Sequence, residues 1–107
     1  MTEQQLTDNI VELCKYLGVL VHHDRPSRTE HGWRTAVQGD AGFPDLVIVS
    51  YGGVLFREVK TNTGQLTGPQ KEWLARLARA GADAGVWRER DWPERIRTEI
   101  EGITRGQ

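Results

Sequence analysis

The 107-residue sequence predicts an α/β fold in which helices cover both faces of a mixed central sheet. Two observations carry this prediction. Apolar residues recur at helical spacing near the start, in the third quarter and at the end of the chain, whereas short and nearly continuous apolar runs lie between them. Those runs are more apolar than a sheet with one solvated face requires. We expect a single domain over residues 1–107, because neither a repeat nor a long linker divides the sequence.

The first helix is expected over about residues 3–17. Thr2 and Gln5 have the spacing of a capping box, apolar residues follow at helical spacing, and Gly18 is typical of a helix end. Cys14 falls on the apolar side of this helix, so we expect it in the core.

Residues 19–23 read as the first strand, followed by a long connection over residues 24–42. A connection of this length in a small domain is usually functional, and residues 33–37 could add a short strand to it. Adjacent strand residues point to opposite faces, so His22 and His23 are not expected to share one metal ion.

A hairpin is expected next. Residues 46–50 form a continuous apolar strand, Gly52-Gly53 marks a tight turn, and residues 54–60 return. With those two glycines as the turn, Asp45 would lie opposite Lys60 and Val47 opposite Glu58.

The remaining elements follow in the same order as their start and stop signals. A polar loop over residues 61–68 precedes a helix that Pro69 opens and Gly81 ends. Residues 84–87 read as a fourth strand, and Pro93 opens a last helix. The predicted order is therefore αβββαβα.

Composition excludes several classes of protein. Charged residues make up 27% and hydrophobic residues 37%, which is the balance of a globular domain rather than of a disordered tail or a membrane protein. The start of the sequence lacks the features of a signal peptide. The single Cys14 excludes an intramolecular disulfide and a cysteine-built zinc site, so we expect a reducing cytoplasm. The small size favours a phage or mobile-element origin, and hence a bacterial or phage-infected cell.

The net charge of −1 argues against a nonspecific coat on nucleic acid. Basic character is local instead. Residues 57–79 hold five Lys and Arg against two Glu, a local charge of +3, so the rest of the chain carries −4.

Three charged residues of the predicted hairpin carry the chemistry. Glu58 and Lys60 lie two apart on one strand and share a face. The expected pairing adds Asp45 to that face, with Asp45 and Glu58 as diagonal neighbours about 7–8 Å apart. A register slip of one residue would remove this convergence.

Two carboxylates around an open position suit Mg²⁺, which takes oxygen ligands and keeps several waters. Such an ion can polarise a phosphodiester and lower the pKa of a bound water. The ammonium of Lys60 could hold the attacking water or offset charge in the transition state. The implied chemistry is metal-assisted hydrolysis of a phosphodiester.

The order of these residues resembles a known signature. Gly42-Phe43-Pro44-Asp45, followed after twelve residues by Glu58-Val59-Lys60, is similar to the PD-(D/E)xK pattern of the restriction-endonuclease-like superfamily. More narrowly, the sequence resembles the VRR-NUC family of virus-type replication-repair nucleases over about residues 1–90. That family has a leading Glu on the first helix, here Glu3, and a Ser/Thr loop followed by a helical Gln, here Thr67 and Gln70. The resemblance implies an αβββαβ core.

The resemblance also implies a ligand set. Asp45 and Glu58 would bind the metal, joined by the main-chain carbonyl of Val59, and Glu3 would approach it through water. For Glu3, the alternative is an ordinary first-turn acid favoured by the helix dipole.

Two further roles follow from the resemblance. Lys60 would be the catalytic lysine. Gln70 lies on the inward face of its helix and would support the site, although it could equally be a simple helix former. Gly68-Pro69 departs from the family, which commonly has Pro followed by an acidic residue.

Four basic residues are candidates for contact with DNA: Arg25, Arg28, Arg34 and Lys71. The three arginines lie in the long connection, where phosphate contact and a merely solvated loop are both reasonable interpretations.

These features predict a structure-specific DNA endonuclease that uses Mg²⁺ or Mn²⁺. The resemblance implies branched DNA, such as a Holliday junction, as the substrate, and the two-fold symmetry of a junction favours a homodimer. The alternatives are a flap or single-strand nuclease of the same fold, a non-catalytic DNA-binding module, and an RNA-processing or accessory subunit.

Overall fold

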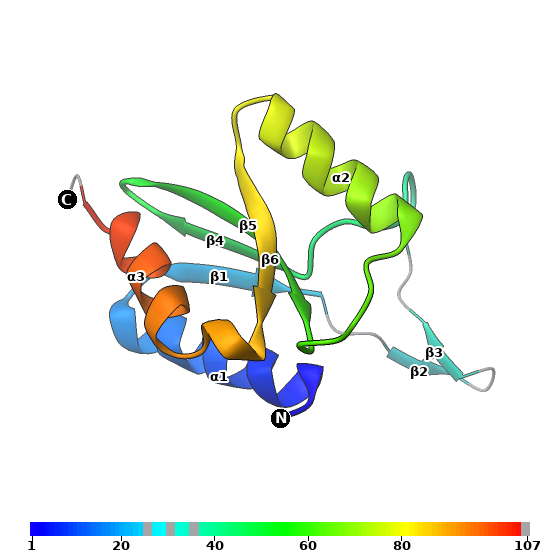
Figure 1. The fold of residues 1–107 in the computed structure, drawn as a ribbon, viewed down its shortest axis with the longest axis horizontal. Helices are drawn as coiled ribbons and strands as arrows, with labels where there is room; N and C mark the ends of the chain where they lie inside the picture. The colour runs from blue at the N-terminus through cyan, green and yellow to red at the C-terminus, as the bar shows by residue number, and fades with distance from the viewer. Residues whose placement is uncertain (25–26, 30–31, 35–36, 106–107) are drawn as a thin grey trace.

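The computed structural model describes residues 1–24, 27–29, 32–34 and 37–105. Its centre is a four-stranded sheet in the order β1-β4-β5-β6 (Figure 1). The strands are β1 (Leu20–His23), β4 (Leu46–Ser50), β5 (Gly53–Lys60) and β6 (Asp83–Arg88). β1, β4 and β5 pair antiparallel, whereas β5 and β6 pair parallel, so the sheet is mixed as predicted.

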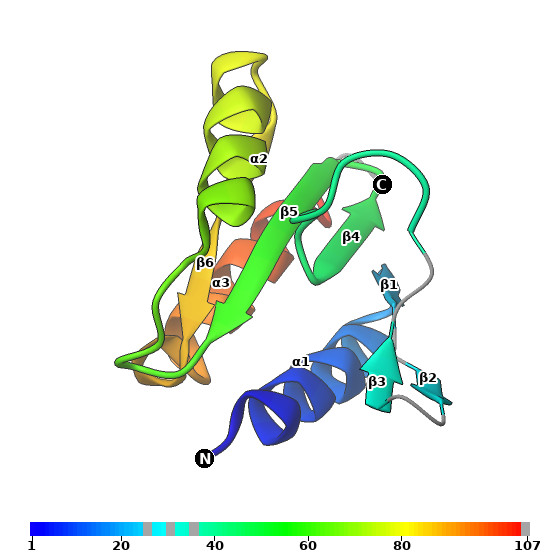
Figure 2. The ribbon, with the colours of Figure 1, turned by 90° about the vertical axis from the view of Figure 1, so that its right-hand side faces the viewer.

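Helices cover both faces of this sheet, which confirms the predicted layers. α1 (Glu3–Leu17) and α3 (Glu94–Gly102) lie on one face, and α2 (Gly68–Arg79) lies on the other (Figure 2). α2 is the crossover between the parallel strands β5 and β6. A one-turn 3₁₀ helix, η1 (Glu89–Asp91), leads from β6 into α3.

The core lies between the sheet and the α1–α3 layer. Alternate residues of the strands point into it, among them Leu46, Ile48, Leu55 and Val59. Cys14 is buried there as expected, and burial raises the pKa of its thiol to about 12, so the sulfur stays neutral.

The predicted register of the central hairpin was wrong by two residues. Ser50 pairs with Gly53, so Tyr51 and Gly52 form the turn, and Leu46 pairs with Arg57. Gly52 donates its backbone N–H to the carbonyl of Ile103 at 2.8 Å, and a Cβ at Gly52 would lie 2.1 Å from the Arg105 carbonyl oxygen. The C-terminal segment therefore packs directly on this turn.

Because the shift is two residues rather than one, every side chain keeps its predicted face. The continued register places Asp45 opposite Glu58, instead of opposite Lys60. Directly opposed residues lie closer than diagonal ones, with Cβ atoms about 4.5–5.5 Å apart. The correction therefore brings the two carboxylates nearer than the expected pairing did.

The long connection contains more structure than expected. Strands β2 (Ser27–Thr29) and β3 (Gly32–Arg34) form a separate antiparallel hairpin beyond the end of β1. β3 contains the first two residues of the strand expected over residues 33–37, and residues 35 and 36 lie outside the described residues.

The loop between β5 and α2 is fastened to the end of β6. Arg88 Nη1 donates to the carbonyls of Thr61 and Gly64 at 2.6 and 2.8 Å. The backbone N–H of Arg90 donates to Asn62 Oδ1 at 3.0 Å. These contacts fix the segment that joins Lys60 to α2. Of the helices in the described ranges, none has the length and apolar character needed to cross a membrane.

Candidate active site

The candidate site lies at the end of the sheet where β4 begins and β5 ends. Asp45 directly precedes β4, and Glu58 lies near the end of β5. Asp45 Oδ2 accepts a hydrogen bond of 2.9 Å from the backbone N–H of Val59. This bond takes the place of the next ladder contact, where the β4–β5 pairing has ended, and it turns the Asp45 carboxylate toward β5.

Glu58 is a buried carboxyl with an incomplete set of partners. It is 2% exposed, and Gln70 Nε2 donates to its Oε2 at 3.2 Å. Its Oε1 is buried without a hydrogen-bond partner. An unpaired buried carboxylate oxygen is costly to the fold, so this atom marks a position where a ligand would compensate.

The environment raises the pKa of Glu58 to about 9 from its ordinary 4.5. Burial is the largest cause, followed by a hydrogen bond and charge repulsion from Asp45, while Lys60 acts in the opposite direction. In the free protein, Glu58 therefore holds a proton at neutral pH. A divalent cation between the Glu58 and Asp45 carboxyls would replace that proton and neutralise both charges.

The donor set fits a hard cation such as Mg²⁺. Asp45 and Glu58 supply two carboxylates. The N–H and C=O of one strand residue point toward the same neighbour, so the carbonyl of Val59 faces the side on which its N–H meets Asp45. Two carboxylates and a backbone carbonyl match the oxygen ligands by which Mg²⁺ is usually held.

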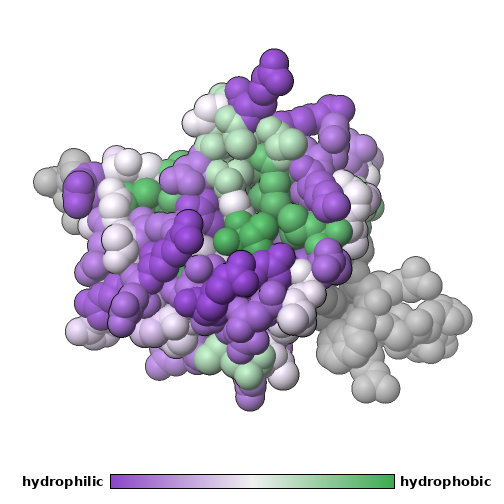
Figure 3. Space-filling model, viewed as in Figure 1, coloured by the Kyte–Doolittle hydropathy of each residue, from purple (hydrophilic) through white to green (hydrophobic). Residues whose placement is uncertain are grey.

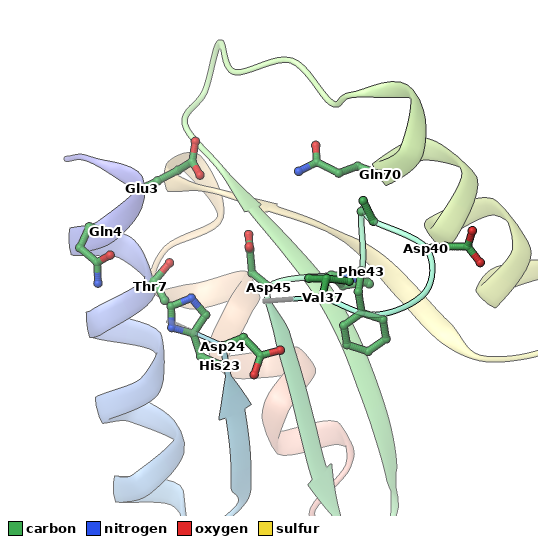
Figure 4. A pocket seen from close by; sticks show the side chains of 13 residues that line it. Glu3, Gln4, Thr7, His23, Asp24, Val37, Asp40, Phe43, Asp45 and Gln70 are labelled. Carbon is green, nitrogen blue, oxygen red and sulfur yellow. The ribbon is translucent and has the colours of Figure 1, made fainter. Parts of the chain in front are cut away.

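Glu3 stands at the start of α1, across the site from Gln70 (Figure 4). Its charge raises the pKa of Glu58, as the smallest of the contributing causes. Within the described part of the chain, no three His, Cys, Asp or Glu side chains form a group that could hold a metal. Glu3 therefore does not complete a three-carboxylate site, and contact with a metal through water stays a prediction beside the alternative of a first-turn acid.

Gln70 is oriented by the helix that carries it. Thr67 and Gln70 form a capping box, in which the Gln70 backbone N–H donates to Thr67 Oγ1 and Gln70 Oε1 accepts from the Thr67 N–H at 3.0 Å. Because Oε1 is taken by the cap, the amide NH₂ is left to donate to Glu58. One local sequence pattern thus caps α2 and aims a donor at the site.

Lys60 lies at the last position of β5, on the same face as Glu58. Its charge lowers the pKa of Glu58. A Cβ added to Gly64 would lie 3.5 Å from Lys60 Cδ, so the fastened loop runs beside the lysine stem. The lysine is therefore held close to the carboxylate pair.

An open cavity of about 370 Å³ adjoins the carboxylate pair. Thr7 and His23 line one wall of it, and Phe43 lies across from them (Figure 4). Asp45 and Gln70 also line it, so the cavity is continuous with the candidate site. The expectation that His22 and His23 diverge is consistent with this geometry, because His22 points to solvent and pairs with Asp24 at 2.7 Å.

The candidate DNA contacts are placed only in part. Arg25 lies outside the described residues. Arg28 and Arg34 belong to β2 and β3, where the backbone alone is described. Lys71 is exposed, next to Gln70 on α2, and does not line the cavity.

Thr7 and His23 were missed by sequence reasoning as residues of this site. Thr7 follows Glu3 by four residues and so lies on the same side of α1. His23 ends β1 beside Leu46, the neighbour of Asp45. The helical spacing was readable from the sequence, whereas the position of β1 next to β4 is a property of the tertiary fold.

A family model described as the VRR-NUC domain matches residues 4–91. The chain belongs to the VRR-NUC family. The predicted resemblance is thereby confirmed, and the matched segment holds every candidate site residue except Glu3.

A solved structure described as a VRR_NUC domain protein shares the fold of this chain, with a TM-score of 0.69 at 20% identity. The similarity covers 96% of this chain and 90% of that one. A search of curated proteins found no significant match. Membership of the VRR-NUC family implies a nuclease-type domain with DNA as the class of partner.

Proposed function

We propose that this VRR-NUC domain is a metal-dependent endonuclease that hydrolyses phosphodiesters of branched DNA. The observation that carries the proposal is the partnerless, buried Oε1 of Glu58 beside Asp45. A purely structural carboxylate in this position would be expected to have acquired a donor, since polar groups are normally paired when buried. A bound cation would give this oxygen its missing partner, and a substrate phosphate would complete the ligands of the cation.

Asp45, Glu58 and the Val59 carbonyl would hold the metal. Bound Mg²⁺ or Mn²⁺ would supply Lewis-acid polarisation of the phosphodiester and make a water more acidic. Asp45 is kept in place by the Val59 N–H, and Glu58 by Gln70, so both carboxylates are oriented before the metal arrives.

Lys60 would act on the attacking water and on the developing negative charge of the phosphate. Its position at the end of β5 brings an ammonium to the edge of the carboxylate pair. The hydrogen bonds from Arg88 to the loop after β5 limit the volume that the lysine side chain can explore. Gln70 orients Glu58 rather than reacting.

Branched DNA, such as a four-way junction, is the proposed substrate, with a homodimer presenting two sites to it. A junction has two-fold symmetry, which a symmetric dimer matches. A flap or single-strand nuclease with the same chemistry is the second candidate, and it differs only in which DNA reaches the site.

The test is cleavage of four-way junction, flap, duplex and single-stranded DNA with Mg²⁺, Mn²⁺ or EDTA. Wild-type protein is compared with Asp45→Ala and Lys60→Ala, and with Arg76→Ala as a control. Arg76 is exposed on α2, where it pairs with Glu72. We expect paired nicks near the junction that require metal, that both site variants lose, and that the control retains.

Cutting confined to flaps or single strands would keep the chemistry and replace the substrate. Binding of DNA without cleavage in any metal would contradict the nuclease proposal and favour a DNA-binding module. A monomeric sedimentation mass with junction DNA bound would contradict the dimer.

A further inference from the structure

The cavity beside the carboxylate pair has a charge that is unusual for a surface that meets DNA. Glu3, Asp24, Asp40 and Asp45 all line it, and none of its described lining residues is lysine or arginine. A phosphate placed away from the metal would therefore be repelled by nearby carboxylates. A neutral part of the substrate would not be.

The wall on one side of the cavity is apolar and fixed. Phe43 packs edge-on against Trp73 and Phe56, with ring centroids 5.1 and 6.2 Å apart, yet it remains 42% exposed. Trp73 Nε1 donates to the Ala41 carbonyl at 2.9 Å, which ties the segment before Phe43 to α2.

Gly42 strengthens this attachment. Its φ of +97° favours glycine, and a Cβ there would lie 2.6 Å from the Pro69 carbonyl carbon. The segment thus touches the start of α2 backbone to backbone. A ligand that contacts Phe43 would therefore not have to order this segment, which lowers the entropic cost of binding.

The opposite wall is polar. Thr7, on α1, and His23, at the end of β1, face the cavity from that side (Figure 4). An apolar wall facing hydroxyl and imidazole groups suits a flat heterocycle that has hydrophobic faces and hydrogen-bonding edges. The volume of about 370 Å³ lies at the small end of ligand pockets, roughly 300–1,000 Å³.

We propose that this cavity receives one unpaired nucleobase adjacent to the phosphodiester that is cleaved. Phe43 contacts the base, and Thr7 and His23 lie along its edge. The inference rests on the proposed nuclease function and deepens it: a base in this cavity has left its stack, so the site selects DNA with unpaired bases at the cleavage point. Branch points supply such bases at low cost, whereas uniform duplex does not.

The test uses a four-way junction with 2-aminopurine at the branch point, and a second junction with an abasic residue at the same position. Fluorescence is measured with Ca²⁺ in place of Mg²⁺, so that binding is followed apart from turnover. The variant is Phe43→Leu, which keeps an apolar side chain in the packing. Tyr51→Ala is the control, because Tyr51 is 84% exposed on the β4–β5 turn and does not line the cavity.

We expect 2-aminopurine fluorescence to change on binding to wild-type protein and to the control, and to change much less with Phe43→Leu. Cleavage of the intact junction by Phe43→Leu should fall about tenfold, within the range for losing one base–aromatic stack. The abasic junction should be cut slowly by wild-type protein, with no further loss in Phe43→Leu.

Equal cleavage of abasic and intact junctions by wild-type protein would overturn the inference. So would an equal loss on both substrates in Phe43→Leu, because that pattern indicates a packing defect. A fluorescence response without cleavage in any metal would leave the base cavity standing while the nuclease proposal fails. Absence of DNA binding would overturn both.

Discussion

Two neighbouring residues of β5 bury ionisable side chains on opposite faces of the sheet, and the two side chains differ in how completely they are hydrogen-bonded. Arg57 is 5% exposed and faces α3, whereas Glu58 is 2% exposed and faces α2. Arg57 donates to the Asp83 carbonyl and carboxylate and to Glu99, each at 2.8 Å. Its guanidinium also lies 5.2 Å from the ring centroid of Trp87.

Glu99 completes the network on the α3 face. Burial alone would raise the pKa of Glu99, but the hydrogen bonds from Arg57, Trp87 and Arg95 outweigh this effect. The pKa of Glu99 is therefore lower than its ordinary value. On the α2 face, Glu58 has Gln70 as its donor and one oxygen without a partner. A buried ionisable group with a full set of partners supports the fold, whereas one that lacks a partner is a candidate for a functional site.

The largest effect is expected from removing the carboxylate on the α2 face. Glu58→Gln should lower cleavage by about 10³-fold or more, in the range of losing a catalytic group, because a neutral amide cannot replace a metal-binding carboxylate. The rate of junction cleavage in Mg²⁺ measures it. Retained activity would show that Glu58 is not a ligand.

The same substitution should stabilise the metal-free protein at high pH. The folded pKa of Glu58, about 9, exceeds its ordinary 4.5. The stability it contributes is therefore fully present below pH 4.5 and is lost as the pH rises toward 9. Glu58→Gln avoids that loss, by an amount on the order of a few kcal/mol at pH 8.5.

Thermal unfolding in EDTA at pH 5 and pH 8.5 tests this stabilisation. The variant should gain on wild-type protein only at the higher pH. An equal difference at both values would contradict a raised pKa.

On the α3 face, Arg57→Met should reduce stability by about 3 kcal/mol, since it removes the arginine donor to the Asp83 carbonyl and one of the three donors to Glu99. Denaturant unfolding gives the free energy. Arg76→Met is the matched control, because it breaks the exposed pair with Glu72 and should cost less than about 1 kcal/mol. A small effect for Arg57→Met would contradict the structural role.

Stabilisation by bound metal should depend on the residues of the α2 face and not on those of the α3 face. Mg²⁺ at about 100 times its Kd at pH 8 should stabilise wild-type protein by about 2.7 kcal/mol. The same Mg²⁺ concentration should stabilise it less at pH 5, because the ion competes with the proton on Glu58. Asp45→Ala should lose this response, and Arg57→Met should keep it. Melting temperatures with and without Mg²⁺ provide the measurement.

The smallest expected effect separates the two functions of the α2 cap. Thr67→Ala and Gln70→Ala should each cost about 1 kcal/mol, because each breaks the capping box. Only Gln70→Ala also removes the donor to Glu58. Cleavage should therefore fall in Gln70→Ala and stay near the wild-type rate in Thr67→Ala; equal rates would mean that Gln70 only caps the helix.

Much of this organisation is local and was predictable from the sequence. The capping box at Thr2, the alternation of β5 and the caps of α2 depend on neighbouring residues, so they define α1, the returning strand and the second helix. The alternation of side chains along a strand also placed Glu58 and Lys60 on one face. A register shift of two residues does not change that face.

The tertiary structure decided the rest. The turn lies at Tyr51-Gly52 rather than at the predicted Gly52-Gly53. The C-terminal segment packs on it, which is a contact between residues about fifty positions apart. In this register, Asp45 lies opposite Glu58. Burial of Glu58 beneath α2 and the position of His23 beside the site likewise depend on distant elements meeting. The sequence by itself determined which groups could form the site; packing decided how close they lie and which oxygen was left without a partner, because desolvation and long-range register are not local properties.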